Sequence, residues 1–236
     1  MGNRGAGDTP VRKVKDPTRL GGNNVPVKRS HAAVARELAA RHVRLARLCE
    51  LAHPLERIIP DQRPLTHLVV RTIVSQLVSV QAARTIMARL LEAHGDMEGI
   101  VTWAMRVPEN ALPSHSLSRA KRKAIAHWGR YMAEHGDPRE QWGDLEPEAL
   151  IAQIMTMRGL GRWSAHMVAI FGFGHPRIWP EGDAGVVRAA NVVFRGMRPA
   201  TVRRLITGHE THVALCCWAL LDKGRLAEFH PIAVRS

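Results

Sequence analysis

The chain has 236 residues, of which 45% are hydrophobic and only 5% aromatic, so it suits one substantial domain whose core consists mainly of aliphatic side chains and Met. Its 34 Lys and Arg residues against 21 Asp and Glu residues give a formal net charge of +13, which favours polyanionic partners, nucleic acid before an anionic membrane surface. Three cysteines, two of them adjacent, argue against a disulfide framework, and the lack of an apolar run of ~18 residues argues against a membrane span.

The first 30 residues predict a disordered basic arm. They are rich in Gly, Asn and Pro, almost free of large apolar side chains, and contain seven basic and two acidic residues. A segment of this composition cannot offset the entropy that ordering would cost. We expect the remaining residues, 31–236, to form one helical domain.

The first predicted helix runs from His31 to about Ala52, where apolar residues recur at helical spacing. A proline-rich loop follows. The stretch "LTHLVVRTIVSQLVSVQAARTIMARLLEAHG" fits either a strand and a helix or two buried helices, and its length and its Ala, Gln and Arg content favour helices. A shorter helix is expected over Met97–Met105.

The stretch "SLSRAKRKAIAHWGRYMAEHG" predicts a helix with a serine cap. Its first turns carry four basic residues, which oppose the helix dipole and indicate either a solvated face or a nearby phosphate. They are Arg119, Lys121, Arg122 and Lys123.

Helical spacing continues through the second half of the chain. Helices are expected from Glu146 to Met157, from Trp163 to about Gly172, through "AGVVRAANVVF", and after Pro199 to about Leu226 with a break near Gly208. Nowhere do four or more residues alternate cleanly, so no strand is predicted. The expected fold class is all-α, as one compact unit with two helical lobes.

The run "MRGLGRWSAHM" places Gly159 and Gly161 directly before a helix. Glycines allow a backbone to approach closely, and the start of a helix offers unpaired N–H groups, so this turn suits an anion such as a DNA phosphate. Two glycines at this spacing also end ordinary helices.

Three segments, in this order, resemble the helix-hairpin-helix (HhH-GPD) superfamily of base-excision DNA glycosylases, and within it the 3-methyladenine DNA glycosylase II branch. "SQLVSVQAARTI" is similar to a Q-[QL]-[IV]-S segment of that branch, "LGRWSA" is similar to the hairpin, and "WPEGD" places Asp183 twenty residues after Trp163, where the family has a catalytic aspartate. The resemblance covers roughly residues 31–200.

The resemblance implies a role for each matching residue. Asp183 would be the catalytic carboxylate, Trp163 and Met167 would form the base pocket, and Gln76 and Leu77 would form the wedge that enters the duplex where the base has left. Phosphate would bind at the hairpin residues Gly159, Leu160, Gly161, Arg162 and Ser164. Each assignment has a structural alternative: Asp183 as a helix N-cap, and Leu77 and Trp163 as core residues.

The resemblance also implies which cofactors are needed. Lyase members of the superfamily carry a Schiff-base lysine where this chain has Trp163, and the iron–sulfur members need four cysteines. We therefore expect no iron–sulfur cluster and no required cofactor, while family hairpins often hold a monovalent cation. His209, His212 and Cys216 fall on one helical face, but they lack a fourth ligand, and no metal is assigned. Trp218 is expected in the core, with a place in a pocket as the alternative.

The expected function is that of a monofunctional DNA glycosylase which removes alkylated purines, of the 3-methyladenine and 7-methylguanine type, from duplex DNA. Met167, in a place where some members have an aromatic residue, and the divergent C-terminal region leave two alternatives open: a non-catalytic sensor of damaged DNA, or a glycosylase for another base such as hypoxanthine or uracil. The expected partner is damaged double-stranded DNA, the expected state a monomer, and the expected location the cytoplasm.

Overall fold

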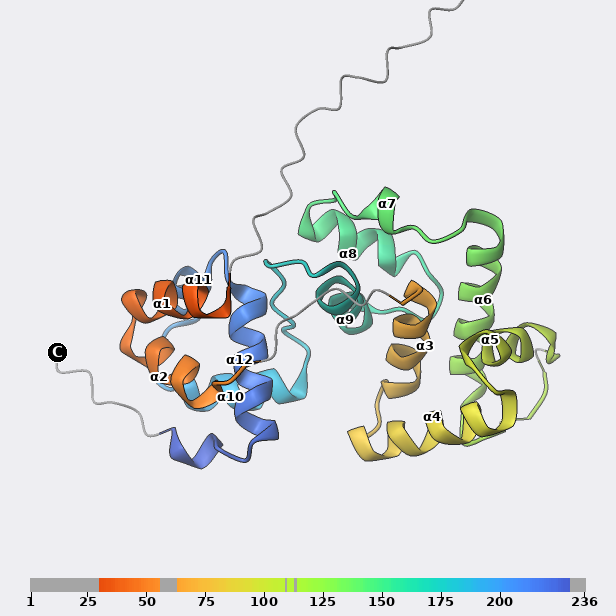
Figure 1. Cartoon of the computed structure of the whole chain (residues 1–236), viewed down its shortest axis with the longest axis horizontal. Helices are drawn as coiled ribbons and strands as arrows, with labels where there is room; N and C mark the ends of the chain where they lie inside the picture. Colours follow the sequence, from red (N-terminus) through yellow and green to blue (C-terminus); the bar gives the residue numbers. More distant parts are fainter. Residues whose placement is uncertain (1–29, 56–62, 109, 113, 230–236) are drawn as a thin grey trace, which may run out of the picture.

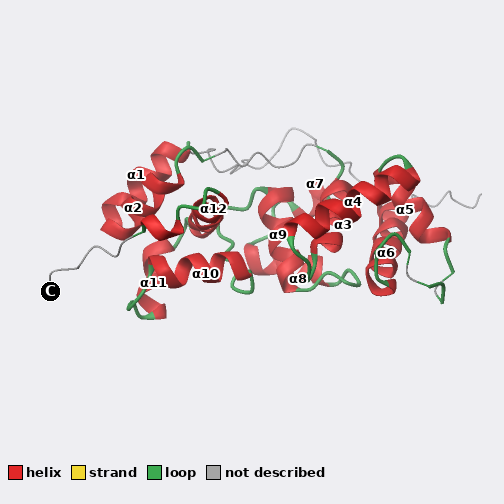
Figure 2. Cartoon of the chain, turned by 90° about the horizontal axis from the view of Figure 1, so that it is seen from below, coloured by secondary structure: helices red, strands yellow, loops and turns green. Residues whose placement is uncertain are grey.

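The computed structural model describes residues 30–55, 63–108, 110–112 and 114–229. The predicted basic arm lies outside these residues except for Ser30, whose hydroxyl accepts a hydrogen bond from the Ala33 N–H at the start of the first helix. Within the described residues the chain forms twelve α-helices, one 3₁₀ turn (Leu226–Glu228) and a single isolated β-bridge, as Figure 2 shows. The all-α prediction is confirmed.

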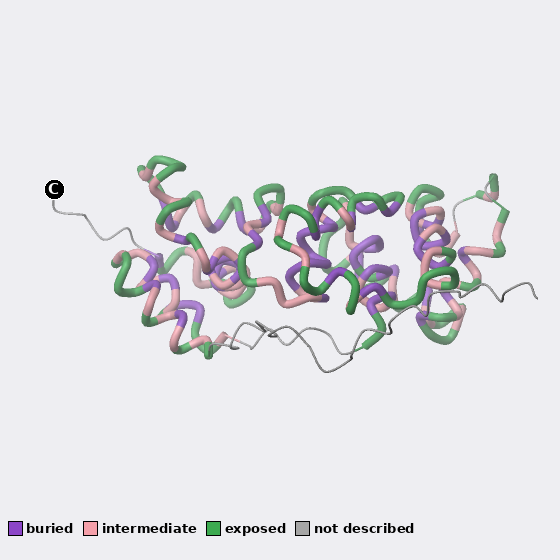
Figure 3. Tube along the Cα trace, turned by 90° about the horizontal axis from the view of Figure 1, so that it is seen from above, coloured by how far each residue is buried: buried purple, intermediate pink, exposed green. Residues whose placement is uncertain are grey.

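The helices form two lobes, each around its own hydrophobic core (Figure 1). Buried positions gather inside these lobes, whereas the outward helix faces are exposed (Figure 3). The larger lobe contains α3 (Leu65–Ser75), α4 (Val80–His94), α5 (Met97–Arg106), α6 (Arg119–His135), α7 (Arg139–Trp142), α8 (Pro147–Met155) and α9 (Arg162–Phe173). The smaller lobe contains α1 (His31–Arg41), α2 (Val43–Ala52), α10 (Ala184–Val193), α11 (Pro199–Ile206) and α12 (Glu210–Asp222). The described part of the chain therefore starts in the smaller lobe, forms the larger one and returns to the smaller one.

The single helix predicted over 31–52 is wrong, because two helices meet at His42. The backbone of His42 is extended, with φ −165° and ψ 139°. Its N–H donates to the Leu38 carbonyl at the end of α1, and its Nδ1 accepts from the Arg44 N–H at the start of α2. Since one residue caps both helices, the chain turns there while the apolar spacing on either side is kept.

Two of the four basic residues in the first turns of α6, Lys121 and Arg122, bind carbonyls of the protein and do not form a solvated face. Lys121 Nζ donates to the Val74 and Gln76 carbonyls at the end of α3, at 2.9 and 2.7 Å. Arg122 is 3% exposed and donates to the Val107 and Pro108 carbonyls after α5. Carbonyls at helix ends lack partners within the helix, so cations stabilise them. Lys121 thereby fixes the turn between α3 and α4.

The break predicted near Gly208 is confirmed, since α11 and α12 are separated there and Gly208 has a φ of +82°. The short helix α7 was not predicted. In the described part of the chain the longest helix, α6, has 17 residues, and no helix combines the length and apolarity needed to cross a bilayer.

Candidate active site

A groove of about 1820 Å³ lies between the two lobes. The larger lobe contributes α3, the α3–α4 turn, α4 and the hairpin before α9, and the smaller lobe contributes the start of α10 and the end of α12. Basic side chains line part of it: Arg63, His67, Arg71, Arg84 and Arg188. The groove therefore has the charge and the size to receive a polyanion.

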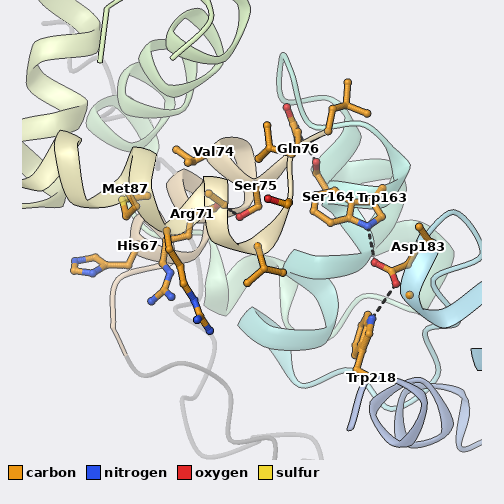
Figure 4. A pocket seen from close by; sticks show the side chains of 18 of the residues that line it. His67, Arg71, Val74, Ser75, Gln76, Met87, Trp163, Ser164, Asp183 and Trp218 are labelled. Atoms are coloured by element: carbon orange, nitrogen blue, oxygen red, sulfur yellow. Dashed lines mark hydrogen bonds between the residues drawn. The ribbon is translucent and has the colours of Figure 1, made fainter. Parts of the chain in front are cut away.

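Asp183 lies in this groove as the N-cap of α10 (Figure 4). Its Oδ1 accepts hydrogen bonds from the Val186 N–H at 2.8 Å and from the Trp218 indole Nε1–H at 2.9 Å. Its Oδ2 accepts one from the Trp163 Nε1–H at 3.0 Å. The N-cap alternative is thus true of Asp183, but the two indole donors show that the side chain does more than cap a helix.

The two indoles come from different lobes. Trp163 belongs to α9 and Trp218 to α12, where it stacks against Phe171 of α9 with ring centroids 5.7 Å apart. A side chain at Gly185 would meet Asp183 Oδ1 at 3.1 Å and Trp218 at 3.3 Å, so glycine leaves room for this contact. A carboxylate oxygen accepts about two hydrogen bonds, and Oδ2 therefore keeps one acceptor position for a group bound in the groove.

The hairpin before α9 needs its first glycine for the fold. Gly159 has a φ of +86°, and a Cβ there would lie 2.4 Å from the Cβ of Ala124. Gly161, the N-cap of α9, has a φ of −78°, a Cβ there would meet nothing within 4 Å, and no side chain caps the helix. The first N–H groups of α9 therefore open onto the groove without an obstructing side chain.

The other predicted phosphate ligands are placed differently. Leu160 is buried, and its N–H donates to the Met157 carbonyl. Arg162 is exposed and lies 3.5 Å from Glu148. The Ser164 hydroxyl is buried and accepts a hydrogen bond from Gln76. Of the five predicted phosphate ligands, Gly159, Gly161 and Ser164 line the groove, whereas Leu160 and Arg162 are not among the lining residues described.

The two glycines give a matched pair of variants. Gly161→Ala is expected to weaken binding to duplex DNA about 10-fold, because its methyl group displaces a phosphate from the helix start. The same variant should lose at most about 1 kcal/mol of unfolding free energy, because its backbone angles suit any residue although alanine is a poorer N-cap than glycine. Gly159→Ala should lower the free energy of unfolding by about 2 kcal/mol or more, from strain and the clash with Ala124. Titration with duplex DNA measures the affinity, and thermal unfolding measures the stability, of both variants. If Gly161→Ala binds duplex as tightly as the natural protein does, the hairpin does not contact the DNA.

Leu77 is the most exposed large apolar side chain described, at 104%, and its φ is +54°. Gln76, beside it, turns inward, and its Nε2 donates to the Gly159 carbonyl and to Ser164 Oγ, both at 2.8 Å. Val80, 70% exposed, adds to the apolar tip of this turn. The alternative that Leu77 is a core residue is wrong: a side chain held fully in solvent in a strained backbone conformation points to a role outside the fold.

Met167 does not lie where the sequence placed it. It is 8% exposed, belongs to the core of the larger lobe and is not among the groove-lining residues described. Although Met167 follows Trp163 by one turn of α9, it lies inside the core of the larger lobe, whereas Trp163 lines the groove. Trp218 takes the place at the carboxylate instead: it lines the groove, as the pocket alternative expected, while its ring also packs against both hydrophobic cores.

Sequence reasoning also missed the arginines of the groove. Arg71 and Arg84 come from α3 and α4, and Arg188 from α10. Arg188 follows Asp183 by five residues, a spacing that could have placed it near the site.

Comparisons with known proteins agree with this architecture. No protein-family model matches the chain. YfjP of Bacillus subtilis, provisionally named a DNA-3-methyladenine glycosylase, is 24% identical over 134 residues, which are 54% of this chain and 46% of YfjP. AlkA of Mycobacterium tuberculosis, provisionally named a bifunctional transcriptional activator and DNA repair enzyme, is 29% identical over 148 residues, which are 59% of this chain and 29% of AlkA. The matched region thus spans less than half the length of these curated relatives.

Among solved structures, the 3-methyladenine DNA glycosylase Mag1 of Schizosaccharomyces pombe, in complex with abasic DNA, superposes with a TM-score of 0.69. The match covers 80% of this chain and 97% of Mag1 at 16% identity. The chain therefore has the fold of the HhH-GPD glycosylases, as the resemblance in sequence implied, and its relatives in sequence carry the names of DNA repair enzymes.

Proposed function

We propose that the chain is a monofunctional DNA glycosylase that excises alkylated purines from duplex DNA. The observation that carries this proposal is the position of Asp183, whose carboxylate two indoles from opposite lobes hold in place within a basic groove. A carboxylate with this fixed orientation suits a reaction in which positive charge develops on a sugar, because preorganised charge needs no reorientation during the reaction.

Access to the N-glycosidic bond requires the nucleotide to leave the base stack. In the proposed complex the start of α9 binds a phosphate beside the damaged site, and the arginines of the groove bind neighbouring phosphates. Leu77 enters the gap that the flipped base leaves, where its apolar side chain replaces lost stacking. The apolar tip formed by Leu77 and Val80 is held at the required place by Lys121 and Gln76.

The flipped base then lies by Trp163 and Trp218, and the sugar lies by Asp183. The C1′–N bond breaks, and its electron pair leaves with the cationic alkylated base, which departs as a neutral purine. The Asp183 carboxylate stabilises the oxocarbenium ion electrostatically and orients a water, whose oxygen bonds to C1′ while its proton passes to the carboxylate and then to solvent. The products are the free base and an abasic site.

Two features support alkylated purines as the substrate class. A base alkylated at N3 or N7 carries a positive charge, which weakens its bond to the sugar and removes the need for a general acid. Indole faces also attract a cation over a neutral base. The position at which lyase members carry their nucleophilic lysine is held by Trp163, which supports hydrolysis without strand cleavage.

A panel of duplexes, each with one lesion, tests the substrate class. We expect single-turnover release of 3-methyladenine and 7-methylguanine to be at least about 10-fold faster than release of hypoxanthine or uracil, because only the former are cationic. Faster release of a neutral base would show that the protein is a glycosylase with a substrate class other than alkylated purines. Tight binding to damaged duplex without release of any base would favour the sensor.

A further inference from the structure

A second cluster of reactive side chains lies in the smaller lobe. Cys49 of α2 and His212 and Cys216 of α12 bring one potential ligand atom each to within 4.8 Å of one another. His31, the first residue of α1, stands beside them, with its Nδ1 3.4 Å from the Nδ1 of His212 and the two ring centroids 5.3 Å apart. Helices α1, α2 and α12 lie together in both views of the fold (Figures 1 and 2).

We propose that Cys49, His212, Cys216 and His31 bind one Zn²⁺ ion in a closed, structural site. Two sulfurs and two imidazole nitrogens form a ligand set that zinc prefers. A tetrahedral site with Zn–S bonds of about 2.3 Å and Zn–N bonds of about 2.0–2.1 Å separates its ligand atoms by roughly 3.3–3.8 Å. The distance of 3.4 Å between the Nδ1 atoms of His31 and His212 already has this value. The ligand atoms of Cys49, His212 and Cys216, which lie within 4.8 Å of one another, need to close by about 1 Å, and His31 needs to move with His212 toward the two sulfurs.

The two thiols suit a divalent cation because they are already in contact with each other across α2 and α12. Zn²⁺ binds cysteine as the thiolate, so its binding to this pair would release protons to solvent.

The site differs from the helical face that the sequence suggested. His209 belongs to another contact, with its Nε2 3.0 Å from Glu37 Oε2. Its place is taken by Cys49 and His31, which are more than 160 residues from His212 in sequence. Spacing along one helix predicts only ligands on that helix, so this set becomes visible only in the folded chain.

A bound ion would tie the first two helices of the lobe to α12. Trp218 follows Cys216 by two residues on α12 and donates to Asp183. The zinc site would therefore fix the helix that orients the catalytic carboxylate, although it lies outside the groove. Its role is structural because all four positions are protein ligands and none is open to a substrate.

The test uses the full chain, purified under reducing conditions without chelator, with zinc measured by atomic emission. We expect one Zn²⁺ per chain, which Cys49→Ser and Cys216→Ser lose. Cys217→Ala is the matched control, because Cys217 is adjacent, fully buried and outside the cluster, and it should keep the metal. Removal of zinc by a chelator should lower the Tm by about 10 °C, and added Zn²⁺ should restore it.

Titration of the zinc-free natural protein with Co²⁺ needs no variant and reads the ligands directly. We expect the ligand-field bands of a tetrahedral ion, a thiolate-to-cobalt charge-transfer band, and saturation at one equivalent. His31→Ala should bind Co²⁺ at least about 10-fold more weakly with a changed spectrum. A disulfide between Cys49 and Cys216, an octahedral cobalt spectrum, or zinc retained by Cys216→Ser would each overturn the proposal.

Discussion

Asp183→Asn is expected to lower the single-turnover rate of base release by roughly 10²–10³-fold. The substitution removes the negative charge that would stabilise the sugar cation. It also places an amide NH₂ where a carboxylate oxygen now accepts, so one of the two indole N–H groups loses its partner. Release of methylated purine from a duplex, measured with enzyme in excess, gives the rate.

Stability and binding separate this effect from misfolding. Asn is as good an N-cap as Asp, so the free energy of unfolding should fall only by the lost hydrogen bond, about 1–2 kcal/mol. Asp222→Asn is the matched control, because Asp222 is an exposed carboxylate that lines the same groove at the end of α12. It should release base at the natural rate. If Asp183→Asn stays within threefold of the natural rate while folded, Asp183 is not the catalytic carboxylate.

Leu77→Ala is expected to lower the rate of base release by about 10–100-fold, because the smaller side chain cannot replace the stacking lost on flipping. The same change should leave the free energy of unfolding within about 0.5 kcal/mol of its natural value, since the side chain is fully exposed. Leu77→Gly should relieve the strain of a φ of +54° and be equally inactive. Loss of activity without loss of stability is the signature of a wedge.

Leu112→Ala is the control for this pair. Leu112 is an equally apolar and largely exposed side chain, at 80%, and it is not among the residues that line the groove. Its truncation should change neither rate nor stability. Equal rates for Leu77→Ala and Leu112→Ala would show that Leu77 does not enter the duplex.

Much of the fold could be predicted from the sequence, because apolar spacing marks helices independently of what they pack against. The ends of the helices and their contacts were harder to predict. The break at His42 depends on one side chain that caps two helices, and the basic turn of α6 looked like a surface because its acceptors, the carbonyls after α3 and α5, are remote in sequence.

Residues of the site that are close in sequence could be predicted, whereas those that only the fold brings together could not. Asp183, Trp163 and the hairpin glycines lie within 25 residues of one another and share a motif, so their proximity could be predicted. Trp218 reaches Asp183 because the chain returns to the smaller lobe after forming the larger one. A tryptophan at this position of the sequence is equally compatible with a place in the core. Met167 was misplaced for the converse reason: helical spacing predicts the face of α9 on which a residue lies but not which part of that face is buried in the core.

The most direct measurement counts the products of one turnover on methylated duplex DNA. With the natural protein in excess, we expect free 3-methyladenine and 7-methylguanine, one abasic site for each base released, and intact strands until alkali is added. With Asp183→Asn we expect binding to the same duplex and almost no free base. Tight binding of the duplex by the natural protein, with no free base and no abasic site, would contradict hydrolysis at Asp183 and leave a protein that detects damage without removing it.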